Sequence, residues 1–437
     1  PNTSTPPSAL TLTTTRRAAQ NARQQMLRSV TKILIASTLL GLSASVVFGD
    51  VFDFGERPLG TEENRRLAAY LAEQAQNMGY AAESLPFTCV RWERGASFLE
   101  RGGVRVPLYP SPFSPAFDQT LDAAVASTTQ QLKRVRGDGR LVFLRDELAK
   151  EPLTPRDYPF YFSALHREIY SLVDERRAAA IVAVTGRHPM YDESPFPLFN
   201  DANFKTPSGY ISQESYAALL DAPRSKIRTV IKSKVYPETG EQWIFRKAAA
   251  TTPAPGKILI FAHMDTAYNT PGALDNAAGV ATLLLVMARL RDYAGPYDLE
   301  FVPFNGEDSP MARGEVTYLD RYRKEMPDIR LGINLDALGF RGAKVAVSTY
   351  NLDAVDQEYL DQQLSPFANL ERGPEWVESD HSIFVFGGVP CLALTSADLA
   401  NTVMTVAHTP RDTSANVDRA LLAEAANFIA QLVTALK

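Results

Sequence analysis

Hydrophobic and polar positions follow two different patterns along this chain. From Ile244 onward, apolar runs of strand length, such as KILIFAH and RLGINLD, alternate with longer segments that have helical spacing. The longest of these segments, from Asn276 to Tyr293, contains the run AAGVATLLLVMARL. Continuous apolar strands separated by helices are typical of a sheet that helices cover on both faces. We therefore predict an α/β fold with a mixed, mostly parallel sheet sandwiched by helices.

The same pattern predicts the other elements of this half. The expected strands are YDLEFVPFN, KVAVST and VPCLALT, and the expected helices span residues 315–324, 354–364 and 414–437. Near the start of the chain, RPLGTEENRRLAAYLAEQAQNMGY predicts one more helix, with Thr61 as its N-cap and Gly79 as its C-cap.

The middle of the chain has a different texture. From about Ala96 to Lys234, short β-like runs such as VRVPLY, GRLVFL and AAAIVAVTG alternate with proline-rich loops. This pattern predicts a small β-rich module with one or two helices. His166 and His188 lie in this region, and nothing there gathers histidines and carboxylates, so we interpret both as surface or hydrogen-bonded side chains.

The first 49 residues predict export. Residues 1–25 are rich in Thr, Ser, Gln, Ala and Arg and lack apolar periodicity, which is typical of a disordered lead. A short basic stretch, an apolar run from Ile33 to Phe48 and small residues follow, which is the layout of a secretory signal peptide, with Met26 as a candidate start. The alternatives are a membrane anchor through residues 33–48 and a buried N-terminal helix.

Length, charge and cysteine content narrow the function classes. A chain of 437 residues suits two domains, or one domain that carries an insertion. The net charge is −5 and no basic block stands out, which argues against nucleic acid as a partner. The two cysteines, Cys89 and Cys391, fit no zinc-ribbon spacing, so a metal site here must use histidine and carboxylate ligands. Whether they form a disulfide stays open.

Polar residues that can bind a metal or move a proton follow the predicted strands. Open α/β sheets place their sites at the carboxyl ends of strands. The residues at these ends and before the last helix are His263, Asp265, Asp275, Asn276, Glu307, Asp308, Asp336 and His408. Each alone is compatible with turn or cap chemistry, but their common position at strand ends favours one metal site.

The residue types fit zinc chemistry. Zinc binds imidazole nitrogen and carboxylate oxygen, and paired metals lie roughly 3.5–4 Å apart. Two histidines and three carboxylates, one of them shared, give each ion three protein ligands and leave room for a water. A carboxylate beside that water can act as a general base. Asp265, two residues after His263, is better placed to orient the imidazole than to bind the same metal.

These motifs resemble the co-catalytic di-zinc aminopeptidases, metallopeptidase family twenty-eight. The family pattern appears here in order as AHMD, PGALDNAAG, NGEDS, NLDALG and AHTP, and ESDHSIFVFGGVPCLAL resembles a further family segment. The match covers roughly residues 255–437, with additional support from ERPLGTEENRRLAAYL. The resemblance implies a peptidase domain made of residues 50–96 and 235–437. Residues 97–234 resemble a protease-associated domain insertion.

The resemblance also implies a role for each residue. One zinc would be bound by His263, Asp336 and the bridging Asp275, and the other by Asp275, Asp308 and His408. Glu307 would be the general base, and Asp265 would orient His263. A cis peptide is expected at Asp275–Asn276, and Asn276, Asp380 and His381 would support the site.

Two positions depart from the family pattern. Asp308 replaces a glutamate and is shorter by one methylene, and Ala407 stands where some members have a carbonyl-polarising tyrosine. The expected function is a secreted or periplasmic zinc aminopeptidase that acts on peptide substrates. The alternatives are a single-zinc glutaminyl cyclase and a non-catalytic receptor-type ectodomain, and carboxypeptidase or dipeptidase activity stays open. The sequence does not decide the oligomeric state.

Overall fold

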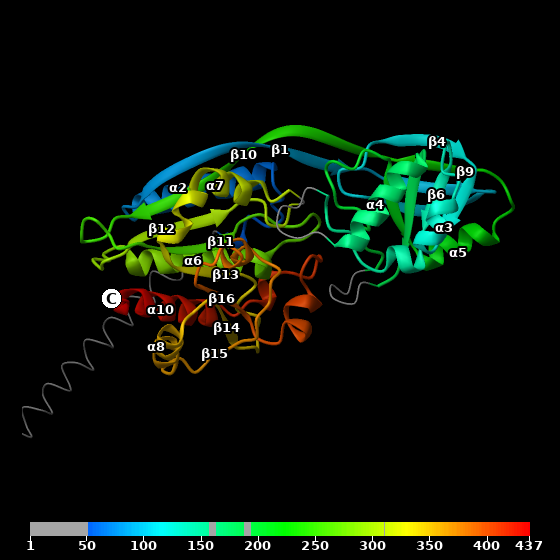
Figure 1. The fold of residues 1–437 in the computed structure, drawn as a ribbon. Helices are drawn as coiled ribbons and strands as arrows, with labels where there is room; N and C mark the ends of the chain where they lie inside the picture. The colour runs from blue at the N-terminus through cyan, green and yellow to red at the C-terminus, as the bar shows by residue number, and fades with distance from the viewer. Residues whose placement is uncertain (1–50, 157–162, 188–193, 310) are drawn as a thin grey trace, which may run out of the picture. The chain divides into compact units, whose positions relative to one another are not determined.

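The computed structural model describes residues 51–156, 163–187, 194–309 and 311–437. The predicted disordered lead and signal-peptide-like segment, residues 1–49, and His188 lie outside these residues. The described strands form two eight-stranded sheets (Figure 1).

The first sheet has the strand order β1-β10-β12-β11-β13-β16-β14-β15. Its strands are β1 (Ala81–Arg94), β10 (Ser233–Lys247), β11 (Lys257–His263), β12 (Asp298–Phe304), β13 (Ile329–Leu335), β14 (Val345–Tyr350), β15 (Leu370–Arg372) and β16 (Cys391–Ser396). Parallel pairs join β11 to β12 and β13, β13 to β16, and β14 to β15, whereas the pairs β1–β10, β10–β12 and β14–β16 are antiparallel. The sheet is therefore mixed and mostly parallel, as predicted.

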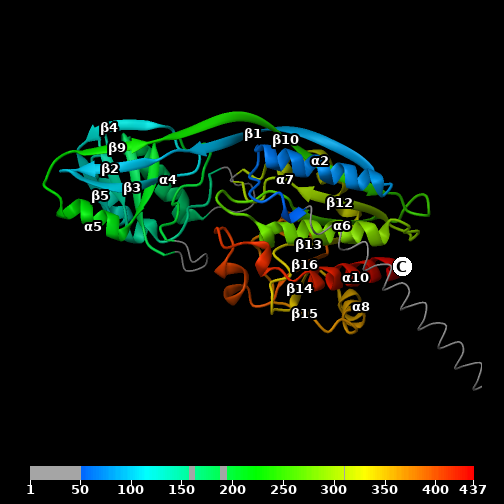
Figure 2. The same cartoon turned by 180° about the vertical axis from the view of Figure 1, so that it is seen from behind.

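Helices cover both faces of this sheet. On one face, α7 (Arg313–Tyr322) and α9 (His381–Val385) contribute Tyr318 and Phe384 to a core with Phe261 and Phe304 of the central strands. On the other face lie α2 (Glu62–Asn77), α6 (Ala278–Leu290) and α10 (Arg419–Ala435), and α8 (Ala354–Leu364) packs beside α10 (Figure 2). The central strands are buried along almost their whole length, which explains their apolar runs.

Two predicted helix starts need correction. The last helix begins at Arg419 rather than Ser414, because Asp418 caps it by accepting a hydrogen bond from the Ala420 amide. The long apolar helix becomes regular only at Ala278, because residues 273–277 form a wide turn. The predicted N-cap Thr61 is confirmed, since its side chain accepts from the Asn64 amide.

The second sheet has the order β4-β9-β2-β3-β8-β7-β6-β5. Its strands are β2 (Ser97–Arg101), β3 (Val104–Pro110), β4 (Phe117–Leu121), β5 (Ala123–Ala126), β6 (Leu141–Leu144), β7 (Ala180–Thr185), β8 (Ser208–Ser212) and β9 (Ile227–Ile231). In its described part this region has the three α-helices α3 (Thr129–Arg134), α4 (Ala164–Arg176) and α5 (Gln213–Asp221), not one or two. Helix α3 escapes prediction because it is short and buries a single side chain, Leu132.

Strands β1 and β10 run antiparallel to each other along their whole length. Their last pair is Arg94 with Ser233, and the Gly95 amide donates to the Lys232 carbonyl at 2.8 Å. The chain therefore leaves and re-enters this ribbon at adjacent positions. That geometry is compatible with an insertion at 97–234, whose status as a separate domain stays a prediction.

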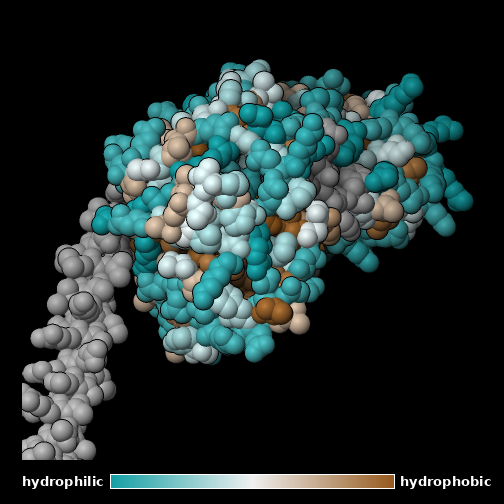
Figure 3. Space-filling model, turned by 60° about the vertical axis from the view of Figure 1, so that its left-hand side comes forward, coloured by the Kyte–Doolittle hydropathy of each residue, from teal (hydrophilic) through white to brown (hydrophobic). Residues whose placement is uncertain are grey.

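The remaining short elements are 3₁₀ turns at Asp146–Ala149, Arg323–Asp328, Leu399–Asn401, Val403–Thr405 and Ser414–Asn416. Within the described residues, one helical stretch, Ala273–Leu290, is long and apolar enough to cross a membrane, but 89% of it is buried inside the protein. This stretch therefore belongs to the core and packs against the first sheet. On the face drawn in Figure 3 hydrophilic residues predominate, and apolar residues gather in small patches.

Candidate metal centre

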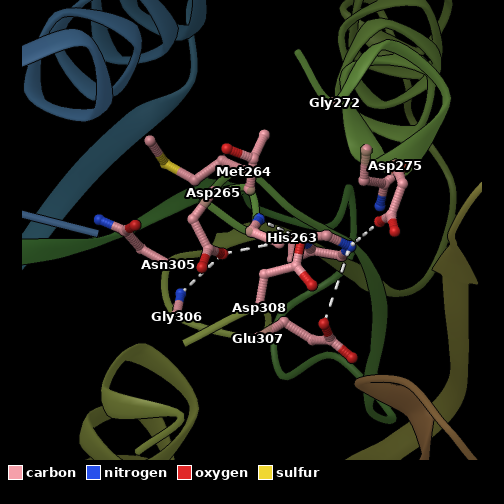
Figure 4. A network of polar contacts seen from close by, with 12 residues as sticks. His263, Met264, Asp265, Gly272, Asp275, Asn305, Gly306, Glu307 and Asp308 are labelled. Carbon is pink, nitrogen blue, oxygen red and sulfur yellow. Dashed lines mark hydrogen bonds and ion pairs between the residues drawn. The ribbon is translucent and has the colours of Figure 1, made fainter. Parts of the chain in front are cut away.

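Parallel pairing brings the predicted strand-end residues to one edge of the sheet. His263 is the last residue of β11, Glu307 and Asp308 follow β12, and Asp336 follows β13. Because β11 is parallel to both β12 and β13, these carboxyl ends lie next to one another. Asp275 reaches the same place from the turn before α6 (Figure 4).

The bridging geometry centres on Asp275. Its Oδ1 lies 3.1 Å from His263 Nε2, and its Oδ2 lies 3.3 Å from His408 Nε2. Asp336 Oδ1 is 3.4 Å from His263 Nε2, and Asp308 Oδ1 is 2.9 Å from His408 Nε2. One carboxylate therefore faces both imidazoles, and each imidazole has a second carboxylate of its own.

Three groups of ligand atoms in the described residues could each bind one ion. Each group has its atoms within 4.8 Å of one another. Two of them, His263–Asp275–Asp336 and Asp275–Asp308–His408, are the triads that the sequence predicts. The third, His263–Glu307–Asp308, brings in the predicted base. Glu307 Oε2 is 4.0 Å from His263 Nε2, farther than Asp275 and Asp336, so the two predicted triads describe the site better.

The turn before α6 fixes the bridging carboxylate through Asn276. The Asp275–Asn276 peptide is cis, as expected from the resemblance. The Asn276 side chain donates to the Leu335 carbonyl at 2.9 Å and accepts from the Gly279 amide at 2.8 Å. The predicted supporting residue Asn276 thus ties the turn to the first residues of α6 and to the end of β13.

Asp265 joins the ends of β11 and β12. Its Oδ1 accepts from the Gly306 amide at 2.9 Å and lies 3.7 Å from His263 Nδ1 (Figure 4). The second distance is longer than a hydrogen bond, so Asp265 lies beside the ring without a direct bond to it. Asp265 is buried, and its predicted role in orienting His263 stays a prediction.

The donor set fits zinc. Neither ring nitrogen of His263 has an aligned hydrogen-bond partner among the described residues, although His263 is buried. A buried imidazole normally has such a partner, and coordination by one nitrogen would satisfy it. Nitrogen and oxygen ligands in groups of three, with an open position, are typical of catalytic zinc.

Several buried carboxylates lie close together in the metal-free site, and this shifts their pKa values. Burial raises the pKa of Glu307 well above its ordinary value, and His263 opposes this shift. Burial would also raise the pKa of Asp275, but hydrogen bonds and charge from His263 and His408 bring it below its ordinary value. The Asp275 carboxylate is therefore ionised at neutral pH, as a cation ligand must be.

The predicted supporting residues Asp380 and His381 differ in their positions. Asp380 is buried, has no hydrogen-bond partner among the described residues for either oxygen, and belongs to the same acidic surroundings. His381 points elsewhere, with Nδ1 3.1 Å from the Asn334 side-chain nitrogen and Nε2 2.8 Å from the Trp376 carbonyl. It belongs to none of the ligand groups.

Sequence reasoning missed three buried charged residues around the site. They are Arg57, Glu315 and Asp412. Arg57 and Asp412 contact the turn that carries Asp275, and burial together with Asp265 raises the pKa of Glu315 to about 8. Arg57 lies in ERPLG and Asp412 in VAHTPRDT, and this adjacency to family-like motifs is the only signal that the sequence offered.

The structure answers two questions that the sequence left open. Cys89 and Cys391 are free, buried thiols. Ala407 is buried and supplies no side-chain donor next to His408. His166, which we interpreted as a surface or hydrogen-bonded side chain, has Nε2 3.0 Å from Glu151 Oε1 and accepts from the Thr154 amide at 3.1 Å with Nδ1.

Comparison with known families identifies this region. Residues 245–433 match the model of peptidase family M28, and this segment contains every predicted metal ligand. This segment is therefore similar to peptidase family M28. Comparison with curated proteins finds no match.

Several solved structures share the fold of this chain. An aminopeptidase from Aneurinibacillus sp. strain AM-1 has a TM-score of 0.69 and 19% identity, over 89% of this chain and 93% of that one. The zinc aminopeptidase BSAP from Bacillus subtilis has a TM-score of 0.67 and 20% identity, with the same coverages of 89% and 93%. A peptidase M28 precursor from Shewanella amazonensis has a TM-score of 0.65 and 18% identity, over 91% and 95%. At these identities the likeness establishes the fold.

Proposed function

We propose that this protein is a zinc-dependent aminopeptidase that removes N-terminal residues from peptides. The observation that carries the proposal is Asp275, whose two oxygens face the Nε2 atoms of His263 and His408 at 3.1 and 3.3 Å. A carboxylate shared between two imidazole–carboxylate pairs is the arrangement that two adjacent cations need. Similarity to the M28 family and the fold shared with solved aminopeptidases support it.

We further propose two zinc ions per chain. His263, Asp275 and Asp336 would bind one, and Asp275, Asp308 and His408 the other. When bound, zinc acidifies a water and polarises the substrate carbonyl. The shorter Asp308 remains compatible with binding, because its Oδ1 already lies 2.9 Å from His408 Nε2 while its Oδ2 accepts from the Ala267 amide at 2.9 Å.

Glu307 has the position of the general base. It follows β12 beside the ligands and lies outside both predicted triads. In peptide hydrolysis the water oxygen attacks the carbonyl carbon, Glu307 accepts a water proton, and the same proton passes to the departing amine nitrogen as the C–N bond breaks. A carboxylate beside the ligands can take up this proton and release it again within one reaction cycle.

The charges around the site favour a free amino terminus over a free carboxylate as the recognised group. A carboxypeptidase or dipeptidase needs an available cation for the substrate carboxylate. The Arg313 guanidinium donates to the Thr88 carbonyl, and the Arg411 guanidinium donates to the Thr405 carbonyl. These two guanidinium groups and that of the buried Arg57 are thus engaged with backbone carbonyls, whereas several buried carboxylate oxygens have no hydrogen-bond partner among the described residues.

The proposal is tested with three substrates. We expect chelator-sensitive hydrolysis of leucine p-nitroanilide, no hydrolysis of its N-acetylated form, and no cyclisation of a peptide that begins with glutamine. Cleavage of the acetylated substrate would contradict recognition of the amino terminus. Cyclisation without hydrolysis would instead establish the glutaminyl cyclase alternative, and no turnover with any substrate would favour the receptor-type alternative.

We also propose export, on the strength of the signal-peptide pattern in residues 26–49. N-terminal sequencing of the native protein tests this. A mature chain that begins near Asp50 is expected, and a chain that keeps residues 27–45 would contradict cleavage.

A further inference from the structure

Arg57 is a fully buried arginine that connects the two loops carrying metal ligands. Its Nε donates to the Met264 carbonyl at 2.7 Å, and its Nη2 donates to the Gly272 carbonyl at 3.0 Å. Its Nη1 donates to the Pro271 carbonyl at 3.2 Å and to the Gly55 carbonyl at 2.8 Å. Met264 directly follows His263, and Gly272 lies three residues before Asp275 (Figure 4).

Asp412, which lies near the C-terminal end of the sequence, accepts hydrogen bonds from the turn that carries Asp275. Its Oδ1 accepts from the Leu274 amide at 2.7 Å, and its Oδ2 accepts from the Asp275 amide at 3.0 Å. Its own carbonyl accepts from the Ala273 amide at 3.3 Å. Asp412 has no exposed surface, so water does not compete for these bonds.

The two residues bind complementary groups of one short turn. Arg57 donates hydrogen bonds to the carbonyls of residues 271–272, and Asp412 accepts hydrogen bonds from the amides of residues 273–275. Fully satisfied polar groups in a low-dielectric interior are rigid, because losing one bond leaves a buried partner unpaired. The backbone that carries the bridging carboxylate is therefore fixed from both sides.

The positive charge of Arg57 also complements the negative charges of the carboxylates around it. Burial lowers its pKa to about 10, while the charges of Asp265, Asp412, Asp275 and Asp308 oppose that shift. It remains a cation at neutral pH and offsets part of the carboxylate repulsion. A buried arginine that binds only backbone carbonyls but lies among acids is well suited to stabilise a metal-ligand cluster before the metal arrives.

We propose that Arg57 and Asp412 are positioning residues that hold the 271–275 turn in its ligand-binding conformation. This inference rests on the proposed zinc site, because it assigns these residues a role in the binding of the ions that Asp275 bridges. Residues behind a metal ligand typically change metal affinity by roughly 10–100-fold when they are replaced. The proposal predicts an effect of that size at positions that do not touch the metal.

Arg57→Lys and Asp412→Asn test the proposal with little change in shape. Lysine keeps the charge but cannot reach several carbonyls in a planar fork. Asparagine keeps one acceptor oxygen but turns an NH₂ group toward a backbone N–H. Arg246→Lys is the matched control, since Arg246 pairs with Glu83 and Glu300 in the same sheet. Zinc affinity is measured by competition with a chromogenic chelator, on protein shown to be folded by circular dichroism.

The expected result is zinc binding weakened about 10–100-fold in both variants and within about twofold of wild type in Arg246→Lys. A purely structural role would lower the melting temperature of the metal-free protein in all three variants and leave zinc affinity unchanged, which would overturn the proposal. If either Arg57→Lys or Asp412→Asn does not fold, the zinc affinity of the other variant tests the proposal. If the wild type binds no zinc, the proposed function fails instead.

Discussion

Glu307 is the side chain on which the proposed chemistry depends. Replacement by glutamine keeps its size and removes its ability to accept a proton. Since general-base catalysis contributes typically 10²–10⁴-fold, we expect Glu307→Gln to lower kcat by about that factor. The zinc content should stay at the wild-type level, because Glu307 lies outside the predicted triads. Steady-state kinetics together with metal analysis checks this, and a variant that keeps most of the wild-type rate would remove Glu307 from the role.

The raised pKa of Glu315 makes the stability of the metal-free protein depend on pH. Burial, together with charge from Asp265 and Glu307, raises its pKa from 4.5 to about 8. Between these values the folded chain holds a proton that the unfolded chain releases, so the free energy of unfolding falls as the pH rises. This stabilisation is complete below about pH 4.5 and lost above about pH 8.

Replacement of Glu315 by glutamine should therefore weaken the pH dependence of the free energy of unfolding. Glutamine does not titrate, so the variant should gain stability relative to wild type on going from pH 5 to pH 8. Thermal unfolding of both proteins in chelator checks this, with Glu73→Gln at an exposed site as the control. Parallel curves for Glu315→Gln and wild type would refute the titration of Glu315.

Residue types at strand ends were enough to predict the ligands, but not what lies behind them. His263, Asp275 and Asp336 follow apolar runs that the sequence makes obvious, and the family-like spacing adds their roles. Arg57 and Asp412 reach the same turn from positions more than 130 residues distant from it. No local pattern distinguishes such side chains from ordinary surface charges, so their burial became visible only in three dimensions.

At the scale of elements, the start of α6 packs closely against the end of β13, next to the site. A Cβ added to Gly279 would lie 2.2 Å from Asn276 Oδ1 and 2.3 Å from the Leu335 carbonyl oxygen. Alanine normally stabilises a helix interior by about 1 kcal/mol over glycine. Here the steric conflict outweighs that gain, because overpacking typically costs about 1–3 kcal/mol and one of the clashing atoms is backbone.

We expect Gly279→Ala to lower the free energy of unfolding by about 1–3 kcal/mol. Urea unfolding followed by circular dichroism measures it. Gly186→Ala is the control, since its Cβ would meet only the Gln213 side chain, at 3.4 Å. A Gly279→Ala protein as stable as wild type would show that α6 can shift away from β13.

Elements with strong periodicity were predicted well, and their ends less well. The strands β11, β12 and β13 are almost entirely buried and mostly apolar runs that a sequence displays directly. The wide turn at 273–277 could not be predicted from periodicity, because Asp275 and Asn276 have non-helical backbone angles and their side chains contact His263 and Leu335. Helix α3 is too short to produce a periodic signal.

At the scale of the whole molecule, the β1–β10 ribbon predicts that the second sheet can be removed. Gly95 and Lys232 are hydrogen-bonded neighbours, so an Asn-Gly turn could replace residues 96–231 and close a hairpin. We expect this shortened protein to fold and to bind as much zinc per chain as the full chain, because all predicted ligands lie outside the deleted segment.

Circular dichroism and metal analysis of the shortened protein check this expectation. Tyr268 would lose its ring contact with Phe113 but keep the hydrogen bond from the Trp92 amide, so only a modest loss of stability is expected. A shortened protein that is unfolded would contradict the predicted insertion at 97–234. A folded one without zinc would mean that the deleted segment supports the site.

The arrangement of the whole molecule was only partly predictable. Alternating strands and helices indicated the first sheet, because parallel neighbours such as β11 and β12, or β14 and β15, are joined through a helix between them in sequence. The second sheet pairs strands that are distant in sequence, such as β2 with β9 and β3 with β8. Short β-like runs do not specify such partners, so the sequence predicted a β-rich region without its topology.

The central claim is that two zinc ions bound at Asp275 enable the release of N-terminal residues. The most direct test is the zinc content of the purified protein by elemental analysis, with hydrolysis of leucine p-nitroanilide measured before and after chelation on the same sample. We predict about two zinc ions per chain, loss of hydrolysis when they are removed, and recovery when zinc is restored. A protein that carries no zinc, or one that hydrolyses the substrate equally well after complete removal of the metal, would contradict the account.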